Sequence, residues 1–324
     1  MEKALFISNL AQNFERISLF FGAGLPTNIQ IPLATQFTFS RETFNGTEFE
    51  AKLKKLQIDQ SEQTVMEFFS TVSNQSVLSY KIFAHLALHD EPEQELMRLK
   101  TNEQALLEVG FKNSTYQKIA ALFLEDVAHA KRAKQLHNEM KKQHHFLTGK
   151  DDIPYAVLLT RQQENASDLA KTMRQYYDFL TKKGFKSGDA LQAMTQLLTL
   201  YSAQYGQVLV DYVVAVKDEF TKRDLKVKKK LYPYIALLAL AGATTETINE
   251  IDELQKELHQ LKMFSIEPQY ALMTAVQFVL HDMIENEKLN DFKDSILFMQ
   301  ALDISSFLGD IKLWVALEIL DLFL

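Results

Sequence analysis

The sequence predicts an all-α protein, a right-handed α-solenoid of helical hairpins of the TPR or HEAT kind, and three observations support this. The 324 residues include only ten glycines and six prolines, so helix breakers are rare. Apolar residues recur at helical spacing along stretches that are polar otherwise. Five stretches share one plan, with a period of about 39 residues, as expected for stacked helix pairs.

Helical periodicity is clearest from Asp168 to Lys183. Apolar residues recur there at spacings of three and four, which places one apolar stripe on a polar helix; they are Leu169, Met173, Tyr176, Tyr177 and Leu180. Signals for strands are scarce, and the best is Gln36 to Phe39. Helix is therefore expected nearly throughout.

The internal repeat sets the architecture. Its anchors lie 35, 39, 40 and 39 residues apart, and an apolar block follows each anchor. The five stretches are FKNSTYQKIAALFL from Phe111, FLTGKDDIPYAVLL from Phe146, FKSGDALQAMTQLL from Phe185, LKVKKKLYPYIALL from Leu225 and FSIEPQYALMTAVQ from Phe264. A second amphipathic helix with a basic end follows most blocks, so each unit is predicted to form a hairpin of two helices.

Glycines and prolines lie where the predicted helices of these units end and begin. Gly110 and Gly184 each precede an anchor phenylalanine, where glycine can take the left-handed conformation that closes a helix. Pro154 and Pro233 occupy corresponding places two units apart, in the first turn of the next helix. The glycines of the Gly22–Gly24 segment lack a phosphate-loop context and are expected to stop a helix before Pro26.

We expect one elongated domain over residues 1–324. Its predicted parts are less regular hairpins over 1–109, regular repeats over 110–284 and capping helices over 285–324, with upstream hairpins around Asn28–Leu56 and Gln63–Val109. The final helix, IKLWVALEILDLFL, is apolar enough to seal the last repeat or to join a second chain as a homodimer.

Composition narrows the class of protein. Apolar residues make up 47% and charged residues 24% of the chain, values typical of a globular protein. The lack of cysteine excludes disulfide scaffolds and thiol chemistry. No export signal and no apolar run of membrane-spanning length is evident, so a cytoplasmic protein without a membrane partner is expected.

Charge is unevenly distributed. Residues 131–230 hold 19 Lys or Arg against 11 Asp or Glu, a balance of +8, whereas the rest of the chain holds 16 against 31. A basic middle favours an acidic protein or peptide as partner. The candidate partner-binding residues are Lys182, Lys183, Lys222, Arg223, Lys226 and Lys228. A solvated turn between helices is the commoner explanation of a run such as Thr221–Lys230, and the net charge of −7 makes nucleic acid an unlikely partner.

A candidate ligand junction lies before the second apolar block, at His144, His145, Thr148, Asp151 and Asp152. A histidine beside paired carboxylates could do acid–base work or hold a cation. The alternative, which we favour, is structural: Thr148 or Asp152 would cap a helix, and the histidines would lie near a helix C-terminus.

The HLALH segment places His85 and His89 on one helical face, a spacing that metal ligands use. No third ligand follows at a suitable spacing, and Asp90 and Glu91 come directly after His89. A polar helix end is the better interpretation, and the sequence predicts no metal, no cofactor and no catalytic residue.

The segment HHFLTGKDDIPYAVLL, from His144 to Leu159, resembles an uncharacterised all-helical family found mainly in Gram-positive bacteria, domain-of-unknown-function family four-thousand-and-three. FLTKKGFKSGDALQ from Phe179 and LYPYIALLAL from Leu231 are similar to it in the same order. The resemblance supports the fold and implies no activity, because the family has none assigned. We therefore expect a non-enzymatic scaffold for a protein or peptide; the alternatives are an enzyme or small-ligand sensor at the His144–Asp152 junction and, third, RNA binding.

Overall fold

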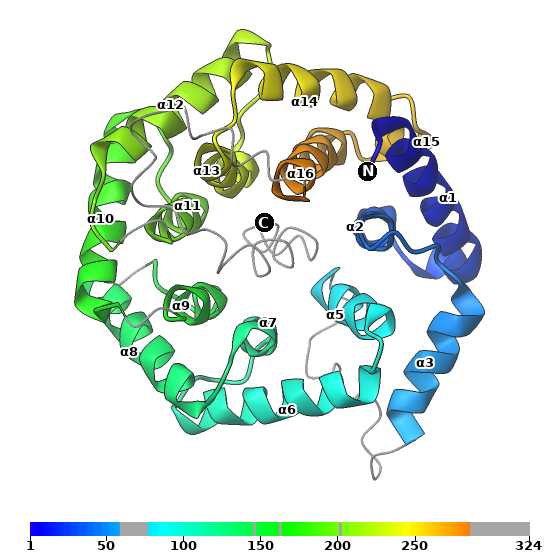
Figure 1. Cartoon of the computed structure of the whole chain (residues 1–324), viewed down its shortest axis with the longest axis horizontal. Coiled ribbons are helices and arrows are strands. Elements are labelled where there is room, and N and C mark those ends of the chain that lie inside the picture. The colour runs from blue at the N-terminus through cyan, green and yellow to red at the C-terminus, as the bar shows by residue number, and fades with distance from the viewer. Residues whose placement is uncertain (59–76, 145–146, 162–163, 201–202, 286–324) are drawn as a thin grey trace. The chain divides into compact units, whose positions relative to one another are not determined.

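The computed structural model describes residues 1–58, 77–144, 147–161, 164–200 and 203–285, and these ranges contain helices and no β-strand (Figure 1). The predicted all-α class is confirmed for them. Contacts between residues group into two compact units, which are described separately: unit 1 holds the described residues of 1–101 and 254–275, and unit 2 holds those of 102–253 and 276–285. The single domain over 1–324 stays a prediction. The predicted C-terminal helix, with its capping or dimer role, lies outside the described residues.

Unit 1 is built around α2, which packs against α1, α5 and α15. The strand signal at Gln36 to Phe39 lies inside α2, so helix prevails there. As predicted, α1 stops before Pro26. The elements are α1 (Lys3–Phe21), η1 (Gly22–Gly24), α2 (Thr27–Phe39), α3 (Gly46–Ile58), α5 (Val77–Leu88), the first part of α6 (Pro92–Glu108), α15 (Lys262–Ile266), the end of α14 (Thr245–Leu258) and the start of α16 (Gln269–Glu285).

One buried amide joins the first two helices of unit 1. The Nδ2 atom of Asn13 donates to the hydroxyl of Thr38 and to the Glu42 carbonyl, both at 3.0 Å. Its Oδ1 atom accepts from the Phe44 N–H at 2.8 Å. Asn13 is 1% exposed, so this pairing satisfies an amide that would be costly to bury alone.

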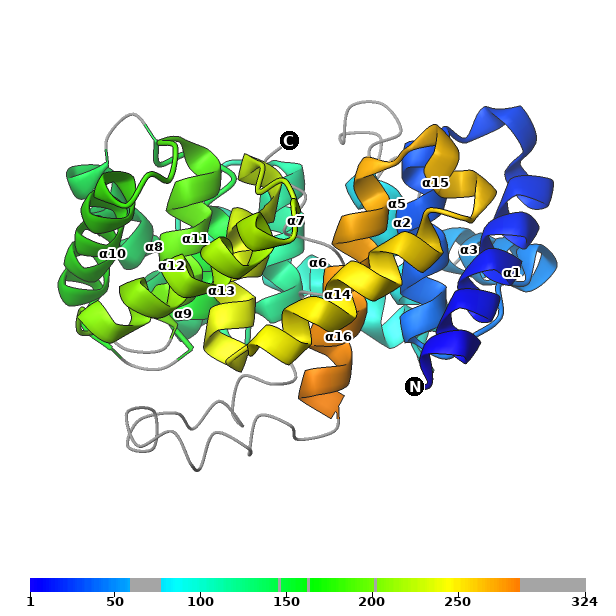
Figure 2. The ribbon, with the colours of Figure 1, turned by 90° about the horizontal axis from the view of Figure 1, so that it is seen from above.

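Unit 2 has two layers of helices (Figures 1 and 2). We call α7, α9, α11 and α13 the anchor helices, because each follows a repeat anchor; successive anchor helices pack on one another. We call α8, α10 and α12 the partner helices; they pack on one another and on the following anchor helix. The bounds are α7 (Thr115–Phe123), α8 (Val127–Gln143), α9 (Ile153–Leu159), α10 (Ala166–Lys182), α11 (Asp189–Thr199), α12 (Gln207–Lys222), η2 (Lys229–Leu231) and α13 (Tyr232–Ala241).

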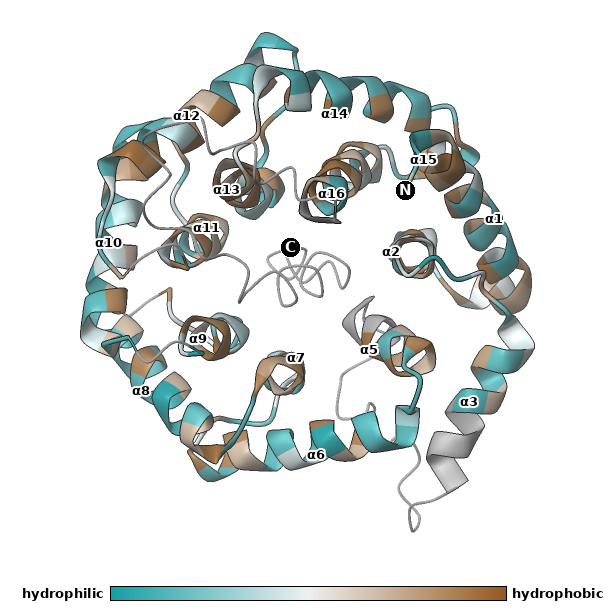
Figure 3. Cartoon of the chain, viewed as in Figure 1, coloured by the Kyte–Doolittle hydropathy of each residue, from teal (hydrophilic) through white to brown (hydrophobic). Residues whose placement is uncertain are grey.

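Hydropathy explains the two layers of unit 2. Every residue of α9 and of α13 is buried, as expected for helices that are apolar on all sides. The partner helices bury one face, and in α10 this face includes all five apolar residues of the predicted stripe. Figure 3 shows polar and apolar residues alternating along α8 and α10. None of the described helices combines the length and apolarity needed to cross a membrane.

The anchors Phe111 and Phe185 close the preceding helix, as predicted. Of the other anchors, Leu225 does the same, Phe264 lies inside α15, and Phe146 lies outside the described residues. Gly184 has φ +82°, and the N–H groups of Gly184 and Phe185 both return to carbonyls of the last turn of α10 at 3.1 Å. Gly110 and Phe111 repeat this geometry after α6. Asp224, with φ +56°, takes the place of the glycine after α12. The apolar anchor then packs back on the helix that it ends.

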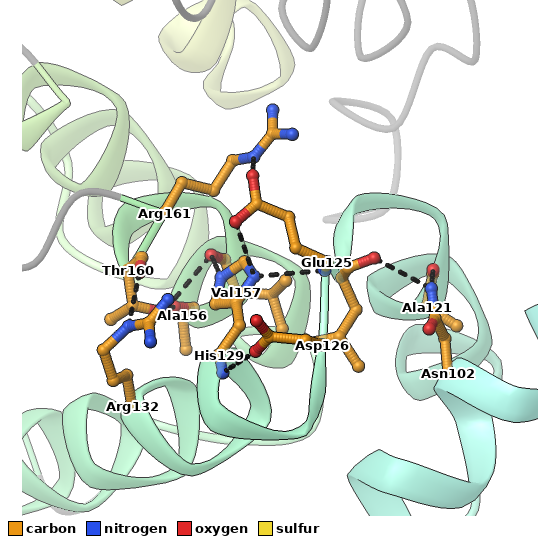
Figure 4. A network of polar contacts seen from close by, with 11 residues as sticks. Asn102, Ala121, Glu125, Asp126, His129, Arg132, Ala156, Val157, Thr160 and Arg161 are labelled. Carbon is orange, nitrogen blue, oxygen red and sulfur yellow. Dashed lines mark hydrogen bonds and ion pairs between the residues drawn. The ribbon is translucent and has the colours of Figure 1, made fainter.

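Side chains of α6 and of the partner helices donate to carbonyls in the last turn of the next anchor helix or shortly after it, where carbonyls lack the full set of helical partners. The donor groups differ in chemistry, but each lies on the helix that precedes the anchor helix whose end it contacts. The bonds are Asn102 Nδ2 to Ala121 O (2.9 Å) and Leu124 O (2.8 Å), His129 Nε2 to Val157 O (2.7 Å), Thr172 Oγ1 to Ala203 O (2.5 Å) and Tyr212 Oη to Ala243 O (2.9 Å). Figure 4 shows Asn102 and His129 in this role.

Candidate functional site

The candidate junction begins at His144, which is the C-cap of α8, as the structural interpretation predicted. Its side chain is 8% exposed, and its ring meets the ring of Tyr177 edge-on with centroids 4.8 Å apart. Burial, together with the positive charge of Arg174, lowers the pKa of His144 to about 4. The imidazole is therefore neutral at physiological pH. His145 lies outside the described residues.

Asp152 occupies the N-cap position of α9, but its side chain makes no cap hydrogen bond there. The capping interpretation is therefore wrong for Asp152. Its Oδ2 atom accepts from the Gly149 N–H at 2.7 Å, and its Oδ1 atom accepts from the Nε2 atoms of Gln192 and Gln196 at 2.8 and 2.5 Å. The carboxyl group, 2% exposed, thus links the loop before α9 to α11.

The surroundings of Asp152 disfavour its charge. Burial first, and then the neighbouring charge of Asp151, raise the pKa of Asp152 to about 7. Burial also raises the pKa of Asp151, and Asp189 adds to this effect. The carboxyl group of Asp152 consequently changes charge near neutral pH, which is unusual for an aspartate.

Two amide oxygens beside Asp152 are unpaired. In the described part of the chain, the Oε1 atoms of Gln192 and Gln196 are buried and have no hydrogen-bond partner. Each oxygen shares a carbon with the nitrogen that reaches Asp152, so both lie next to the carboxyl group. Thr148 is close as well, with its Oγ1 atom 3.5 Å from Gln192 Nε2. The junction is therefore rich in hydrogen-bond acceptors.

Gly149 is held from two sides. His137 Nε2 lies 2.7 Å from the Gly149 carbonyl, and Asp152 accepts from the Gly149 N–H. A Cβ atom at Gly149 would come within 2.5 Å of an oxygen of Asp151. Sequence reasoning missed His137 and both glutamines. The available signal was a pair of glutamines four residues apart in the apolar block of α11.

The HLALH segment forms a different cluster. His85 Nε2 lies 2.9 Å from Glu95 Oε1, and two nitrogens of Arg98 bind the same carboxylate. Burial raises the pKa of Glu95, but the hydrogen bonds and charges of Arg98 and His85 outweigh this and hold it well below its usual value. No group of three or more His, Cys, Asp or Glu suited to a metal ion occurs in the part of the chain that the structure describes.

Two basic segments meet beside α11. We call residues 182–188 and 226–230 the lysine loops. Lys229 Nζ donates to the Ser187 carbonyl at 2.9 Å, and the Lys186 N–H donates to the hydroxyl of Tyr232 at 3.0 Å. The hydroxyl of Tyr177 accepts from the Gly188 N–H, which fixes the first loop further. The exposed lysines of the two loops are Lys182, Lys183, Lys186, Lys226, Lys228 and Lys229.

The structure thus brings four of the six candidate partner-binding residues into the lysine loops. The other two, Lys222 and Arg223, bind Glu219 at 2.5 and 2.7 Å and hold the pKa of its carboxyl at about 2. Arg223 also donates to Asn249 Oδ1 on α14 at 2.7 Å. Arg223 therefore joins α12 to α14, and its part in partner binding stays a prediction.

Comparison with known proteins supports the resemblance seen in the sequence. Residues 27–306 match the model of a family described as a protein of unknown function (DUF4003). The chain belongs to this family. It is also 25% identical over 230 residues to the uncharacterized protein YeaA of Bacillus subtilis (strain 168), an alignment that covers 68% of this chain and 69% of YeaA. No solved structure matches the chain. The DUF4003 match includes both the junction and the lysine loops.

Proposed function

We propose that this DUF4003 protein is a non-enzymatic scaffold, a right-handed α-solenoid of the TPR or HEAT kind with a period of about 39 residues, that binds an acidic segment of a protein or peptide in the cytoplasm. The regular anchors, the two helical layers of unit 2 and the recurring helix-end contacts support the repeat architecture. Repeat proteins of this kind present extended surfaces that usually bind polypeptides.

The lysine loops carry the proposal. Their exposed lysines form no ion pair with the described residues, although carboxylates elsewhere in unit 2 are paired with cations. Hydrogen bonds from the Lys186 and Gly188 N–H groups to tyrosine hydroxyls fix the backbone of the first loop, and the ammonium group of Lys229 is held at the Ser187 carbonyl, which ties the second loop to the first. Preorganised positive charge favours fast, salt-dependent association with an acidic partner.

The test uses fluorescence anisotropy with a short, labelled peptide of alternating Glu and Ser. Lys182, Lys183, Lys226 and Lys228 are changed together to Glu. We expect binding to weaken at least about tenfold at low salt, and the unmodified protein to lose affinity as ionic strength rises. Arg223 is left unchanged because its substitution would break the contact between α12 and α14.

The matched control changes four exposed basic residues outside the lysine loops to Glu, which alters the net charge by the same amount; they are Arg16, Lys112, Lys131 and Lys262. Affinity should fall less than about twofold in this control. Equal losses in the two variants would show that net charge alone drives binding, and the proposal would be wrong. Thermal melts of both variants verify that they fold.

A second candidate function, a small-ligand sensor at the junction, is favoured by one observation: Asp152 is buried without capping α9, and two unpaired amide oxygens adjoin it. Such a site would take a hydrogen-bond donor, an amine or a polyol. Thermal-shift screening of simple amines and polyols tests this. A shift that the variant Asp152→Asn abolishes supports a site here, and equal shifts in both proteins refute it.

A further inference from the structure

An exposed aromatic patch lies on unit 2 between α10 and the start of α12. It consists of Phe179 and Tyr205. Phe179 is 37% exposed, and Tyr205 is half-buried. The rings of Phe179 and Tyr205 stack with centroids 5.0 Å apart and an interplanar angle of 24°. The patch therefore leaves part of its aromatic surface open to solvent.

The aromatic patch is rigid. The Gly206 N–H donates to the hydroxyl of Tyr176 at 3.1 Å, and Thr172 Oγ1 donates to the Ala203 carbonyl at 2.5 Å. Tyr176 is fully buried, and its ring lies 5.1 Å from that of Tyr205. The segment that carries Tyr205 is thus fixed to α10 on both sides of the ring, and little conformational entropy would be lost when a partner binds.

One residue connects the aromatic patch to the lysine loops. Lys182 belongs to the first loop, and its Nζ atom lies 5.1 Å from the centroid of the Phe179 ring. Asp178, next to Phe179 in the sequence, pairs with Arg174 at 2.9 Å. Asp211 acts electrostatically on Tyr205 and accepts from the neutral amide of Gln207 at 3.0 Å. Apolar and basic surface are therefore contiguous here.

We propose that the aromatic patch and the lysine loops together bind an acidic segment that carries a large apolar side chain, which packs on Phe179 and Tyr205 while its neighbouring carboxylates meet the lysines. This inference rests on the proposed function and names its partner more closely. Interfaces commonly combine a rigid aromatic anchor, which supplies most of the affinity, with a charged rim, which supplies orientation and rate. Charge complementarity selects an acidic polypeptide over a neutral one.

The test compares two labelled peptides of alternating Glu and Ser, one with a central Trp and one with Ser at that position. With the unmodified protein, we expect the Trp peptide to bind at least about fivefold more tightly. The variant Phe179→Ala should remove this difference and leave the affinity for the Ser peptide unchanged. Val127→Ala serves as the control, because Val127 is also exposed but lies at the start of α8.

The outcomes separate the two proposals. If the lysine variant loses both peptides and Phe179→Ala changes neither, the patch plays no part and the inference is wrong while the scaffold proposal stands. If the lysine variant binds both peptides normally, the proposed function itself fails. A labelled single-stranded RNA that binds more tightly than either peptide, and is lost in Phe179→Ala, would assign the patch to base stacking and overturn the inference.

Discussion

Replacing Asp152 with alanine is expected to lower the free energy of unfolding by about 3–6 kcal/mol, because two buried donors and one half-buried donor lose their acceptor at once. The donors are the Gly149 N–H and the amide nitrogens of Gln192 and Gln196. Asp152→Asn keeps an oxygen for the two glutamines and should cost clearly less. Urea denaturation of the three proteins at one pH measures both effects.

The same residue should also make stability depend on pH. The folded protein holds the proton of Asp152 more tightly than the unfolded chain does, because its pKa is raised from 3.8 to about 7. The contribution of this group to stability is therefore complete at low pH and is lost as pH rises through that interval, a change on the order of 4 kcal/mol. Relative to the unmodified protein, Asp152→Asn should gain stability from pH 4 to pH 8.

Asp151 provides the control for this pH dependence. Its charge raises the pKa of Asp152, so Asp151→Asn should shift the transition to lower pH without abolishing it. Parallel stability curves for Asp152→Asn and the unmodified protein over the whole range would show that the carboxyl group does not titrate near neutrality. They would also remove the observation that favours a sensor at the junction.

His137 should make stability depend on pH in the opposite direction, with stability lost at low pH. Burial, with smaller contributions from Lys141 and Lys134, lowers its pKa from 6.5 to about 4, while its bond to the Gly149 carbonyl partly opposes this. The folded protein therefore binds this proton less tightly than the unfolded chain does. Stability should fall by about 3 kcal/mol as pH drops from 6.5 to 4. The variant His137→Gln, which can still donate to Gly149, should lack this loss.

Urea denaturation at several pH values measures the difference between His137→Gln and the unmodified protein. His137→Ala is the matched control, since it loses the donor to Gly149 and leaves a cavity, and it should be less stable than His137→Gln at every pH. The prediction is refuted if His137→Gln shows the same acid sensitivity as the unmodified protein.

Local features of unit 2 could be predicted from the sequence, because their causes are local. Gly184 before Phe185 is enough to indicate where α10 ends, and the apolar spacing along α10 is enough to indicate its buried face. Pro154 likewise marks the first turn of α9. These features depend on the conformation and hydropathy of a few neighbouring residues.

The candidate site could be predicted only in part, because its decisive contacts are distant in sequence. The density of polar groups at the junction pointed to Asp152, but capping was favoured, since the nearest backbone N–H groups are the default partners of such a residue. The glutamines that bind it lie 40 and 44 residues further along. Whether a basic side chain is available to a partner also depends on the fold, as the contact of Arg223 with Asn249, 26 residues further along, shows.

The side chains that donate to carbonyls at the ends of the anchor helices limit how freely this chain can evolve by exchanging hairpins. The acceptor is always a carbonyl, but the donor is the amide of Asn102, the imidazole of His129, the hydroxyl of Thr172 or the phenol of Tyr212. These groups differ in reach, so each hairpin is matched to the one before it. Duplication or recombination of a single hairpin would leave carbonyl groups without a hydrogen-bond donor where the new hairpin meets its neighbour. The repeats therefore share one backbone plan, but the side-chain contacts between neighbouring repeats differ from one junction to the next.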